Sequence, residues 1–318
     1  MDERNPRWVY GPVHSRRLGR SLGIDLVPFK VCTYDCIYCQ LGRTTNKTRE
    51  RGHFFVERVG EVLEEIRGKL DRDPKPDYIS LAGSGEPTLN DQTGPLIEGI
   101  KAMTDVPVAV LTNGSLLWMK EVRDALSRAD LVLPSLDAGD ERTFRLVNRP
   151  NPKIGFEKMV NGIVEFARNY NGSLWLEVFL LDGINTDPES VKKIAALAER
   201  INPEKIQLNS VSRPPAEDFA KPVGRRKLEE LSTIFSGKVE VIAEYTGANH
   251  VESENGALND SAILALLSRR PCTVEGISMG LGLKTGTVVK RLGLLFDSGA
   301  VRTVRRDNGI FYEAVRSQ

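Results

Sequence analysis

The sequence predicts an α/β fold followed by a smaller unit of different composition. Between residues 54 and 245, apolar strand-like segments alternate with amphipathic helix-like segments in about six βα units. The strand segments are too apolar for a sheet with one face in water, so we expect a parallel sheet with helices outside it. Such a sheet is either a full or partial barrel or a doubly wound sheet. After a polar stretch at 246–256, the pattern changes to three short helices and two strands.

The alternating region begins with a helix-like segment at 54–70, in which Val59, Val62 and Ile66 fall on one face. The next apolar segment, 77–83, has the length of a buried strand. The same pair of patterns then repeats along the chain. Further helices are predicted at 94–103, 119–129, 156–170, 188–201 and 224–235, and further strands at 107–114, 131–138, 173–183, 205–211 and 239–245.

Charge and composition exclude several classes of protein. With 44 Lys and Arg against 43 Asp and Glu, the net charge of +1 gives no overall attraction to nucleic acid or anionic membrane. No apolar run approaches the ~20 residues that cross a bilayer, and the charged N-terminus lacks the apolar core of a signal peptide. We therefore expect a cytoplasmic protein with no membrane partner.

The carboxyl-terminal residues predict a winged helix-turn-helix. Helical segments at 260–270, 273–283 and 284–299 precede two strand segments that flank Asn308-Gly309, a strong tight-turn signal. Three helices followed by a β-hairpin is the order of that module. The expected domains are a first domain at 1–245, a linker at 246–256 and the winged helix-turn-helix at 257–318.

This last module has a local basic bias. From Ala257 to Gln318, nine Lys and Arg stand against five Asp and Glu, a net charge of +4. Winged helices bind nucleic acid backbones, but they also bind proteins and peptides, and both readings stay open. Phe311 and Tyr312 are explained as well by packing within the hairpin as by base stacking. The cations on the expected recognition helix and wing are Lys284, Lys290, Arg291, Arg302, Arg305 and Arg306.

Three of the four cysteines, Cys32, Cys36 and Cys39, fall within eight positions. In a reducing compartment such a cluster indicates metal or redox chemistry rather than disulfides. Three thiolates hold three irons of a [4Fe–4S] cluster and leave the fourth iron open to another ligand. A structural zinc site is the alternative, with His53 as the nearby fourth ligand. We interpret the distant Cys272 as a small buried residue.

The spacing Cys32-x3-Cys36-x2-Cys39, with Tyr38 before the third cysteine, resembles the signature of the radical S-adenosylmethionine (SAM) superfamily. The resemblance implies a [4Fe–4S] cluster whose open iron binds the amino and carboxylate groups of SAM. An electron from an external donor such as ferredoxin or flavodoxin then cleaves SAM to a 5′-deoxyadenosyl radical, which abstracts a hydrogen atom from the substrate. It also implies a partial (β/α)6 TIM-like barrel, to which the winged helix-turn-helix is appended.

A second stretch, "AGSGEPTL" at 82–89, resembles the GGEP motif of the same superfamily. Ser84 stands in place of the first glycine, and Gly85 and Glu86 carry the match. Gly85 allows a close approach of the backbone to a ligand. The resemblance implies that this strand end binds the methionine ammonium group of SAM.

Polar residues at the ends of later strands complete the expected SAM site. In parallel barrels the carboxyl ends of the strands form the active site, and the superfamily places contacts to the SAM carboxylate and ribose there. A buried carboxylate such as Asp137 also needs a partner. Together with Tyr38, the candidate residues are Thr112, Asn113, Ser135, Asp137, Glu177 and Asn209.

The segment before the cysteines, "YGPVHSRRLGRSLGIDLVPFKVC", resembles a branch grouped with enzymes that form the wyosine base in tRNA. Arg16, Arg17 and Arg20 are suited to bind a substrate phosphate or carboxylate, or they form surface ion pairs. Lys30 is suited to stabilise an anionic ligand.

The substrate is expected to be a macromolecule, and we favour RNA over a protein or peptide presented by the winged helix. The chain has no second cysteine cluster, unlike the wyosine enzymes, which use one. A third hypothesis is an iron–sulfur regulator that binds DNA. A regulator needs only the cysteines, whereas a radical enzyme needs the strand-end residues as well.

Overall fold

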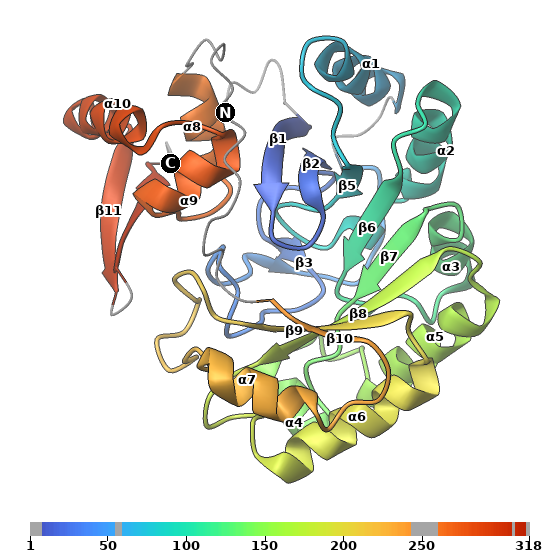
Figure 1. Cartoon of the computed structure of the whole chain (residues 1–318). Coiled ribbons are helices and arrows are strands. Elements are labelled where there is room, and N and C mark those ends of the chain that lie inside the picture. The colour runs from blue at the N-terminus through green and yellow to red at the C-terminus, as the bar shows by residue number, and fades with distance from the viewer. Residues whose placement is uncertain (1–7, 55–58, 243–259, 307–308, 316–318) are drawn as a thin grey trace.

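An eight-stranded sheet forms the centre of the structure, a computed structural model that describes residues 8–54, 59–242, 260–306 and 309–315 (Figure 1). The strand order is β1-β2-β5-β6-β7-β8-β9-β10. Strand β1 is antiparallel to β2, and every following pair is parallel. Among the described residues the two edge strands, β1 and β10, do not pair with each other, so the sheet is an open, partial barrel. The strands are β1 Val9–Ser15, β2 Gly19–Ile24, β5 Tyr78–Leu81, β6 Val108–Thr112, β7 Leu131–Pro134, β8 Ser173–Leu180, β9 Lys205–Ser210 and β10 Val239–Val241.

Helices cover the outer side of the curved sheet, as Figure 1 shows for α1 to α6. Their apolar faces, for example Ile100, Ile163 and Ile194, are fully buried in one core with the strands. Asp187 caps α6 by accepting a hydrogen bond of 3.0 Å from Ser190 N. The helices are α1 Val59–Leu70, α2 Thr93–Met103, α3 Lys120–Leu126, α4 Glu141–Val147, α5 Phe156–Asn169, α6 Pro188–Ile201 and α7 Arg225–Ser232, with a 3₁₀ turn at Pro87–Leu89. The predicted α/β fold with a parallel sheet is confirmed.

Two elements differ from the sequence expectation. Residues 9–24 form the hairpin β1–β2. It was not predicted because Gly11, Pro12 and a β-bulge between Tyr10 and Val13 interrupt the alternation of apolar and polar residues that indicates a strand. The short helix α4 was also not expected, because only Phe144 and Val147 of its seven residues are buried. Residues 55–58 of the first predicted helix and 243–245 of the last predicted strand lie outside the described residues.

The C-terminal unit contains α8 Asp260–Leu267, α9 Val274–Leu281 and α10 Thr285–Asp297, followed by the antiparallel hairpin of β11 Val301–Arg306 and β12 Gly309–Ala314. This is the predicted order of elements. The linker and Asn308 lie outside the described residues, and the assignment as a winged helix-turn-helix and the domain boundaries stay predictions.

The C-terminal unit packs against the barrel through β1. Helices α8 and α9 both contact β1, and Val13 is buried in the same apolar cluster as Ile263 and Ile277. The guanidinium carbon of Arg269 lies 4.3 Å from the ring centroid of Tyr10. Cys272 is buried in this cluster, as predicted. Phe311 is also buried, which agrees with packing rather than base stacking.

Candidate functional site

The cysteine loop crosses the carboxyl ends of the parallel strands. It begins at Val31 and Cys32, which form the two-residue strand β3 (Val31–Cys32) paired with β4 (Asn46–Lys47). On one side Glu86 N donates to Val31 O at 3.2 Å, and on the other Ile37 N donates to Val147 O at 3.0 Å. Backbone hydrogen bonds to the segment after β5 and to the last residue of helix α4 (Glu141–Val147) therefore fix the path of the loop.

The cysteine loop packs so closely on Gly85 that no larger residue fits there. A Cβ atom at this position would lie 1.9 Å from Val31 O and 2.9 Å from Val27 Cγ2. The sequence interpretation gave the glycine a different reason, a close approach to a ligand. The structure shows that the backbone of the cysteine loop is the close neighbour. The role of Gly85 in binding SAM stays a prediction.

Each of the three cysteine sulfurs accepts a hydrogen bond from a different side chain. Lys30 Nζ donates to Cys39 Sγ at 3.1 Å. Asn113 Nδ2 and Asn148 Nδ2 donate to the sulfurs of Cys32 and Cys36, both at 3.6 Å. Such N–H···S contacts stabilise thiolates and are among the features that set the potential of iron–sulfur clusters. Each of the three sulfurs therefore has an N–H donor that would stabilise its thiolate form.

Without metal, two of these thiols strongly favour the protonated form. Burial, followed by the nearby Glu86 carboxylate, raises the pKa of Cys32 to about 12. Burial and the Asp137 carboxylate also raise the pKa of Cys36 well above its usual value. A bound metal deprotonates a coordinating thiol outright, so metal binding is what makes these thiolates stable at neutral pH.

The donor set fits a cubic cluster better than one zinc ion. Within the described ranges, no three His, Cys, Asp or Glu side chains converge as a single metal ion requires. His53, the fourth ligand that zinc would need, instead contacts Asp91 Oδ1 through Nδ1 at 2.5 Å. A [4Fe–4S] cluster gives each cysteine its own iron, so the sulfurs need not meet at one point.

The ends of β5 and β6 form a closed polar network, which we name the β5–β6 rim: Ser84, Gly85, Glu86, Thr112 and Asn113. Glu86 is buried, and its two carboxylate oxygens accept four hydrogen bonds, from Thr88 N, Thr88 Oγ1, Thr112 Oγ1 and Asn113 N, at 2.6 to 3.1 Å. Burial raises the pKa of Glu86, while these donors favour its charged form.

Ser84 is held by a residue that the sequence interpretation missed. Its backbone N and its Oγ donate to the carboxylate of buried Asp25, at 3.0 and 2.5 Å. The Asn113 amide donates to Thr33 Oγ1 at 2.7 Å as well as to Cys32. The Ser84 side chain therefore bonds to Asp25, and the other polar side chains of the β5–β6 rim bond to one another, to Thr88 or to the cysteine loop.

Residues of three neighbouring strands form a second group, which we name the β7–β9 rim: Ser135, Asp137, Glu177 and Asn209. Ser135 and Asp137 follow β7 and Asn209 is next to the last residue of β9, whereas Glu177 lies within β8 and not at the strand end that the sequence predicts. Asp137 accepts hydrogen bonds from Tyr38 OH at 2.5 Å, Asn148 Nδ2 at 2.7 Å and Phe179 N at 3.0 Å. Burial raises its pKa to about 6. The Tyr38 ring stacks on Phe179 with centroids 3.9 Å apart, so the residue before the third cysteine is fixed in place.

Of the three carboxylates in the two rims, that of Glu177 is the most exposed. Its Oε1 accepts hydrogen bonds from Arg17 Nη1 at 2.6 Å and Asn209 Nδ2 at 3.0 Å, and Ser135 Oγ lies 3.4 Å from Oε2. Its side chain keeps 15% of its surface exposed. The structure thus brings Ser135, Glu177 and Asn209 together, and it adds Arg17.

The three arginines before the cysteines have separate positions. Arg17 reaches the β7–β9 rim, whereas Arg20 Nη2 donates to Lys75 O at 2.6 Å. Asn148, which links Asp137 to Cys36, was missed because it follows the unexpected helix α4. An asparagine that follows a helix does not by itself predict a residue of the site.

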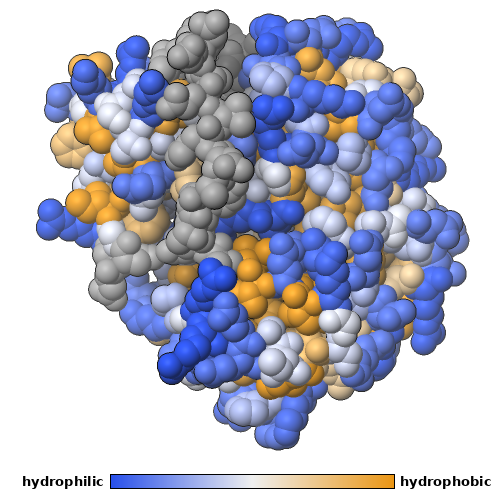
Figure 2. Space-filling model, in the orientation of Figure 1, coloured by the Kyte–Doolittle hydropathy of each residue, from blue (hydrophilic) through white to orange (hydrophobic). Residues whose placement is uncertain are grey.

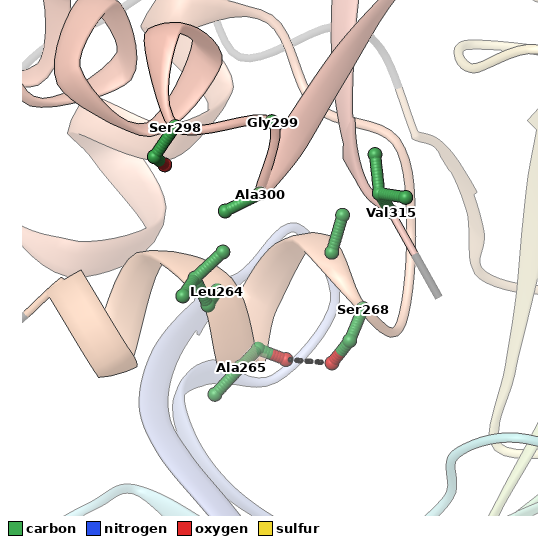
Figure 3. Close-up of a pocket in the computed structure, with 8 residues that line it drawn as sticks. Leu264, Ala265, Ser268, Ser298, Gly299, Ala300 and Val315 are labelled. Carbon is green, nitrogen blue, oxygen red and sulfur yellow. Dashed lines mark hydrogen bonds between the residues drawn. The ribbon is translucent and has the colours of Figure 1, made fainter. Parts of the chain in front are cut away.

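A separate hollow of about 510 Å³ lies inside the C-terminal unit, between α8, the end of α10 and the β11–β12 hairpin (Figure 3). Its lining consists of small and aliphatic residues and two serines, and Ser268 Oγ donates to Ala265 O at 3.1 Å. None of the candidate site residues lines it, so we assign the chemistry to the cysteine loop and the two rims. Among the described residues, no helix has the length and apolarity to cross a membrane.

Comparison with known proteins agrees with this geometry. Residues 26–201 match the family model of the Radical SAM superfamily. The UPF0026 protein MJ1312 of Methanocaldococcus jannaschii is 36% identical, over 96% of this chain and 95% of its own length. A Brachyspira hyodysenteriae protein named GTPase Obg is 40% identical over 92% of this chain, which spans 43% of that protein.

Solved structures show the same fold. A radical SAM methyltransferase from Sphaerobacter thermophilus matches with a TM-score of 0.51 and 16% identity, over 70% of this chain and 65% of that one. Streptococcus suis SuiB bound to its precursor peptide SuiA matches with a TM-score of 0.50 and 13% identity, over 69% of this chain and 48% of that one. The match to the family model over more than half of its residues shows that this chain belongs to the radical SAM superfamily.

Proposed function

We propose that this radical SAM enzyme abstracts a hydrogen atom from an RNA substrate that the C-terminal unit helps to bind. As a member of its superfamily it uses a [4Fe–4S] cluster and SAM, and it needs an electron donor. When bound, the reduced cluster and SAM supply a 5′-deoxyadenosyl radical that takes a hydrogen atom from the substrate.

Different residues of this chain would hold the cluster and SAM. Cys32, Cys36 and Cys39 would hold three irons, and their three N–H donors would stabilise the sulfurs. Glu177 of the β7–β9 rim would contact the polar groups of SAM, since its side chain is partly exposed, and buried Asn209 would hold the Glu177 carboxylate in place. The β5–β6 rim would hold the cysteine loop in position and offer its backbone to the methionine ammonium group.

The observation that carries the RNA proposal is the exposed positive charge of the C-terminal unit. Lys284 and Lys290 of α10 and Arg302 and Arg305 of β11 are exposed. Of these, Arg302 pairs with Glu313 at 2.6 Å. Exposed cations along a helix and a neighbouring strand suit a phosphate backbone. The resemblance of the N-terminal segment to wyosine-forming enzymes points to the same class of substrate.

A protein or peptide substrate is the second candidate. On the same helix α10, Val289, Leu294 and Phe296 are at least half exposed, and hydrophobic residues reach the surface of this unit (Figure 2). The fold neighbour SuiB binds a precursor peptide. Membership in an enzyme superfamily favours both candidates over a DNA-binding regulator.

The first experiment tests the radical chemistry. The chain is reconstituted anaerobically with iron and sulfide, reduced with dithionite and given SAM, and 5′-deoxyadenosine is measured. Formation of 5′-deoxyadenosine is expected, and no cleavage by an intact, reduced cluster would contradict the proposal.

The second experiment identifies the substrate. Nucleosides from total RNA and peptides from total protein are compared by mass spectrometry between a deletion strain and its parent. We expect a modified nucleoside to disappear in the deletion strain. An unchanged RNA profile with a changed protein would replace RNA by the second candidate.

A further inference from the structure

Two cation-rich segments of the chain lie against the cysteine loop. The first comprises residues 43–49. Its strand β4 pairs in parallel with β3, which places Lys47 directly opposite Cys32. Thr48 N also donates to Cys32 O at 3.0 Å. A single backbone hydrogen bond therefore joins this segment to a candidate ligand of the cluster.

The second segment, residues 142–153, begins inside α4. Ile37 N of the cysteine loop donates to Val147 O at 3.0 Å. The two segments also bond to each other, because Lys47 Nζ donates to Arg149 O at 3.1 Å. They therefore form one continuous surface beside the cysteine loop, which we name the basic face.

The basic face is strongly positive in a chain whose net charge is only +1. Its two segments contain seven Lys and Arg and no Asp or Glu. One exposed acid, Glu50, follows the first segment directly. The seven cations are Arg43, Lys47, Arg49, Arg142, Arg145, Arg149 and Lys153.

Carboxylates from outside the two segments pair with three of these cations. Glu217 Oε1 lies 2.8 Å from Arg43 Nη2 and 2.5 Å from Arg149 Nη1. Glu141 Oε1 lies 2.5 Å from Arg145 Nη2. Even so, the Arg43 side chain keeps 69% of its surface exposed. The exposed cations with no ion pair in the described ranges are Lys47, Arg142 and Lys153.

Two exposed apolar side chains lie beside this positive charge. Leu146 of α4 is 47% exposed, and Phe219, in the segment after β9, is 50% exposed. Leu146 directly precedes Val147, whose carbonyl group accepts the hydrogen bond from Ile37 N. Apolar residues with a charged rim around them are typical of a surface that binds another protein.

The segment that carries Phe219 is fixed to the other side of the cysteine loop. Glu217 N donates to Ile37 O at 2.9 Å, and Arg213 Nη1 donates to Gln40 Oε1 at 2.9 Å. The segments of both exposed apolar residues therefore bond to Ile37, which lies between the second and third cysteines.

The position of the basic face indicates its partner. The chemistry of the superfamily needs an electron from a donor, and the rate of electron transfer falls steeply with the distance between two redox centres. A donor on the basic face would lie against the loop that carries all three candidate ligands. Electron-transfer complexes have small interfaces, and opposite charges speed their association. A positive face therefore fits a negatively charged donor.

We propose that the basic face binds the electron donor, a small acidic electron-transfer protein. In the complex the donor loses one electron and the cluster gains it, and no bond is made or broken. The inference rests on the radical chemistry of the proposed function and not on the choice of RNA as substrate. RNA is the alternative occupant of a basic surface, and the test separates the two.

The test measures reduction of the cluster by protein donors, without SAM and without substrate. The probes are the flavodoxin and the ferredoxin of the organism that makes this chain, each reduced beforehand. Stopped-flow absorbance follows the bleaching of the reconstituted cluster. Equilibrium binding of the oxidised donors and of a fluorescein-labelled single-stranded RNA is measured in parallel. Dithionite, a small reductant that needs no docking surface, verifies that each variant holds an intact cluster.

The variants reverse charges that have no ion pair in the described chain: Lys153→Glu, Arg142→Glu and the two combined. Lys238→Glu is the matched control. Lys238 is exposed directly before β10, at the amino ends of the parallel strands, whereas the cysteine loop crosses the carboxyl ends. Phe219→Ser tests the apolar part of the surface.

We expect each single reversal to slow reduction at low donor concentration about tenfold, and the double variant about 100-fold, because like charges oppose association. Lys238→Glu should leave the rate unchanged. Added salt should slow reduction of the wild type and narrow its difference from the variants. Phe219→Ser should speed dissociation of the donor without changing the salt dependence.

Three results would overturn the inference. In the first, neither donor reduces the wild-type cluster although dithionite does. In the second, the reversed variants are reduced as fast as Lys238→Glu. In the third, they lose affinity for RNA and not for the donors, which would assign the basic face to an RNA substrate. If the donors reduce the cluster through the basic face but SAM is not cleaved, the docking site stands and the proposed radical chemistry fails.

Discussion

Each of the two rims contains a glutamate, Glu86 after β5 and Glu177 within β8, but the surroundings of the two carboxylates differ. Glu86 is buried, and all four of its hydrogen-bond donors come from residues 88–113 of the same rim. Glu177 is partly exposed and is held by Arg17 and Asn209, from two different strands or turns. A carboxylate saturated by its own chain supports the structure, whereas an open one remains available to a ligand. The β5–β6 rim therefore positions the cysteine loop, and the proposal above gives contacts to SAM to the β7–β9 rim.

The largest effect is expected at the cysteines that both rims support. Changing Cys32, Cys36 or Cys39 to Ala should abolish stable cluster binding, because each thiolate holds its own iron. Cys272→Ala is the control, since this thiol is buried in the C-terminal core. Iron content and the visible spectrum after anaerobic reconstitution measure the effect. A lost cluster in Cys272→Ala would make that residue a fourth ligand and remove the open iron.

Gly85→Ala tests whether the β5–β6 rim positions the cysteine loop. The new Cβ would overlap Val31 O, so we expect a loss of more than about 3 kcal/mol in unfolding free energy and poor cluster retention. Gly52→Ala is the control, because a Cβ there meets no atom within 4 Å. Urea unfolding of both variants measures the difference. Equal stability would show that the loop and the rim are not packed together as described.

The two glutamates test the comparison directly. Glu86→Gln places an amide N–H against donors and should cost about 3 kcal/mol of unfolding free energy, because a saturated buried network is broken. Glu177→Gln should change stability by less than about 1 kcal/mol but weaken SAM binding about tenfold. Urea unfolding and equilibrium dialysis with labelled SAM provide the two measurements. The opposite pattern would exchange the roles of the rims.

Asp137 of the β7–β9 rim gives stability a dependence on pH. Its pKa of about 6 in the folded chain exceeds the usual 3.8, so the folded state holds a proton that the unfolded state has released. The unfolding free energy of the metal-free chain should therefore fall as the pH rises from about 4 to about 6, by up to about 3 kcal/mol. Asp137→Asn cannot titrate and should flatten this part of the profile. A parallel profile for wild type and variant would contradict the assignment.

The smallest expected effect concerns Lys30, whose charge lies beside one sulfur while neutral amides serve the other two. Lys30→Met removes the donor to Cys39 and should lower the cluster potential by roughly 60 mV, the one-electron equivalent of about 1.4 kcal/mol. Redox titration followed by electron paramagnetic resonance measures the potential. Exposed Lys192→Met, on α6, is the control. An unchanged potential would reduce Lys30 to a packing role.

The sequence predicts the parts of the site that depend on spacing and order. The three cysteines, the strand-end polar residues and the alternation of βα units all follow from local patterns, and the structure gathers them as expected. Asp25, Asn148 and Gln40 could not be predicted, because their roles depend on which distant strand ends meet. For Gly85 the structure adds a second reason for a glycine, since only the packed loop shows that Val31 O is its neighbour.

The β1–β2 hairpin escaped prediction for a related reason. Its bulge and its glycines remove the regular alternation of a strand, and the packing partners of Val13 come from the far end of the chain. A short sequence window contains neither its parallel partner β5 nor the C-terminal residues that cover Val13.

The burial of Val13 in the core of the C-terminal unit has a consequence for synthesis on the ribosome. Val13 and Ile263 are about 250 residues apart in the chain, so the first strand emerges long before the residues that cover it. The Val13 side chain therefore lacks its cover until α8 and α9 have been synthesised. A nascent chain stalled before residue 260 would therefore leave Val13 without the residues that cover it in the folded protein.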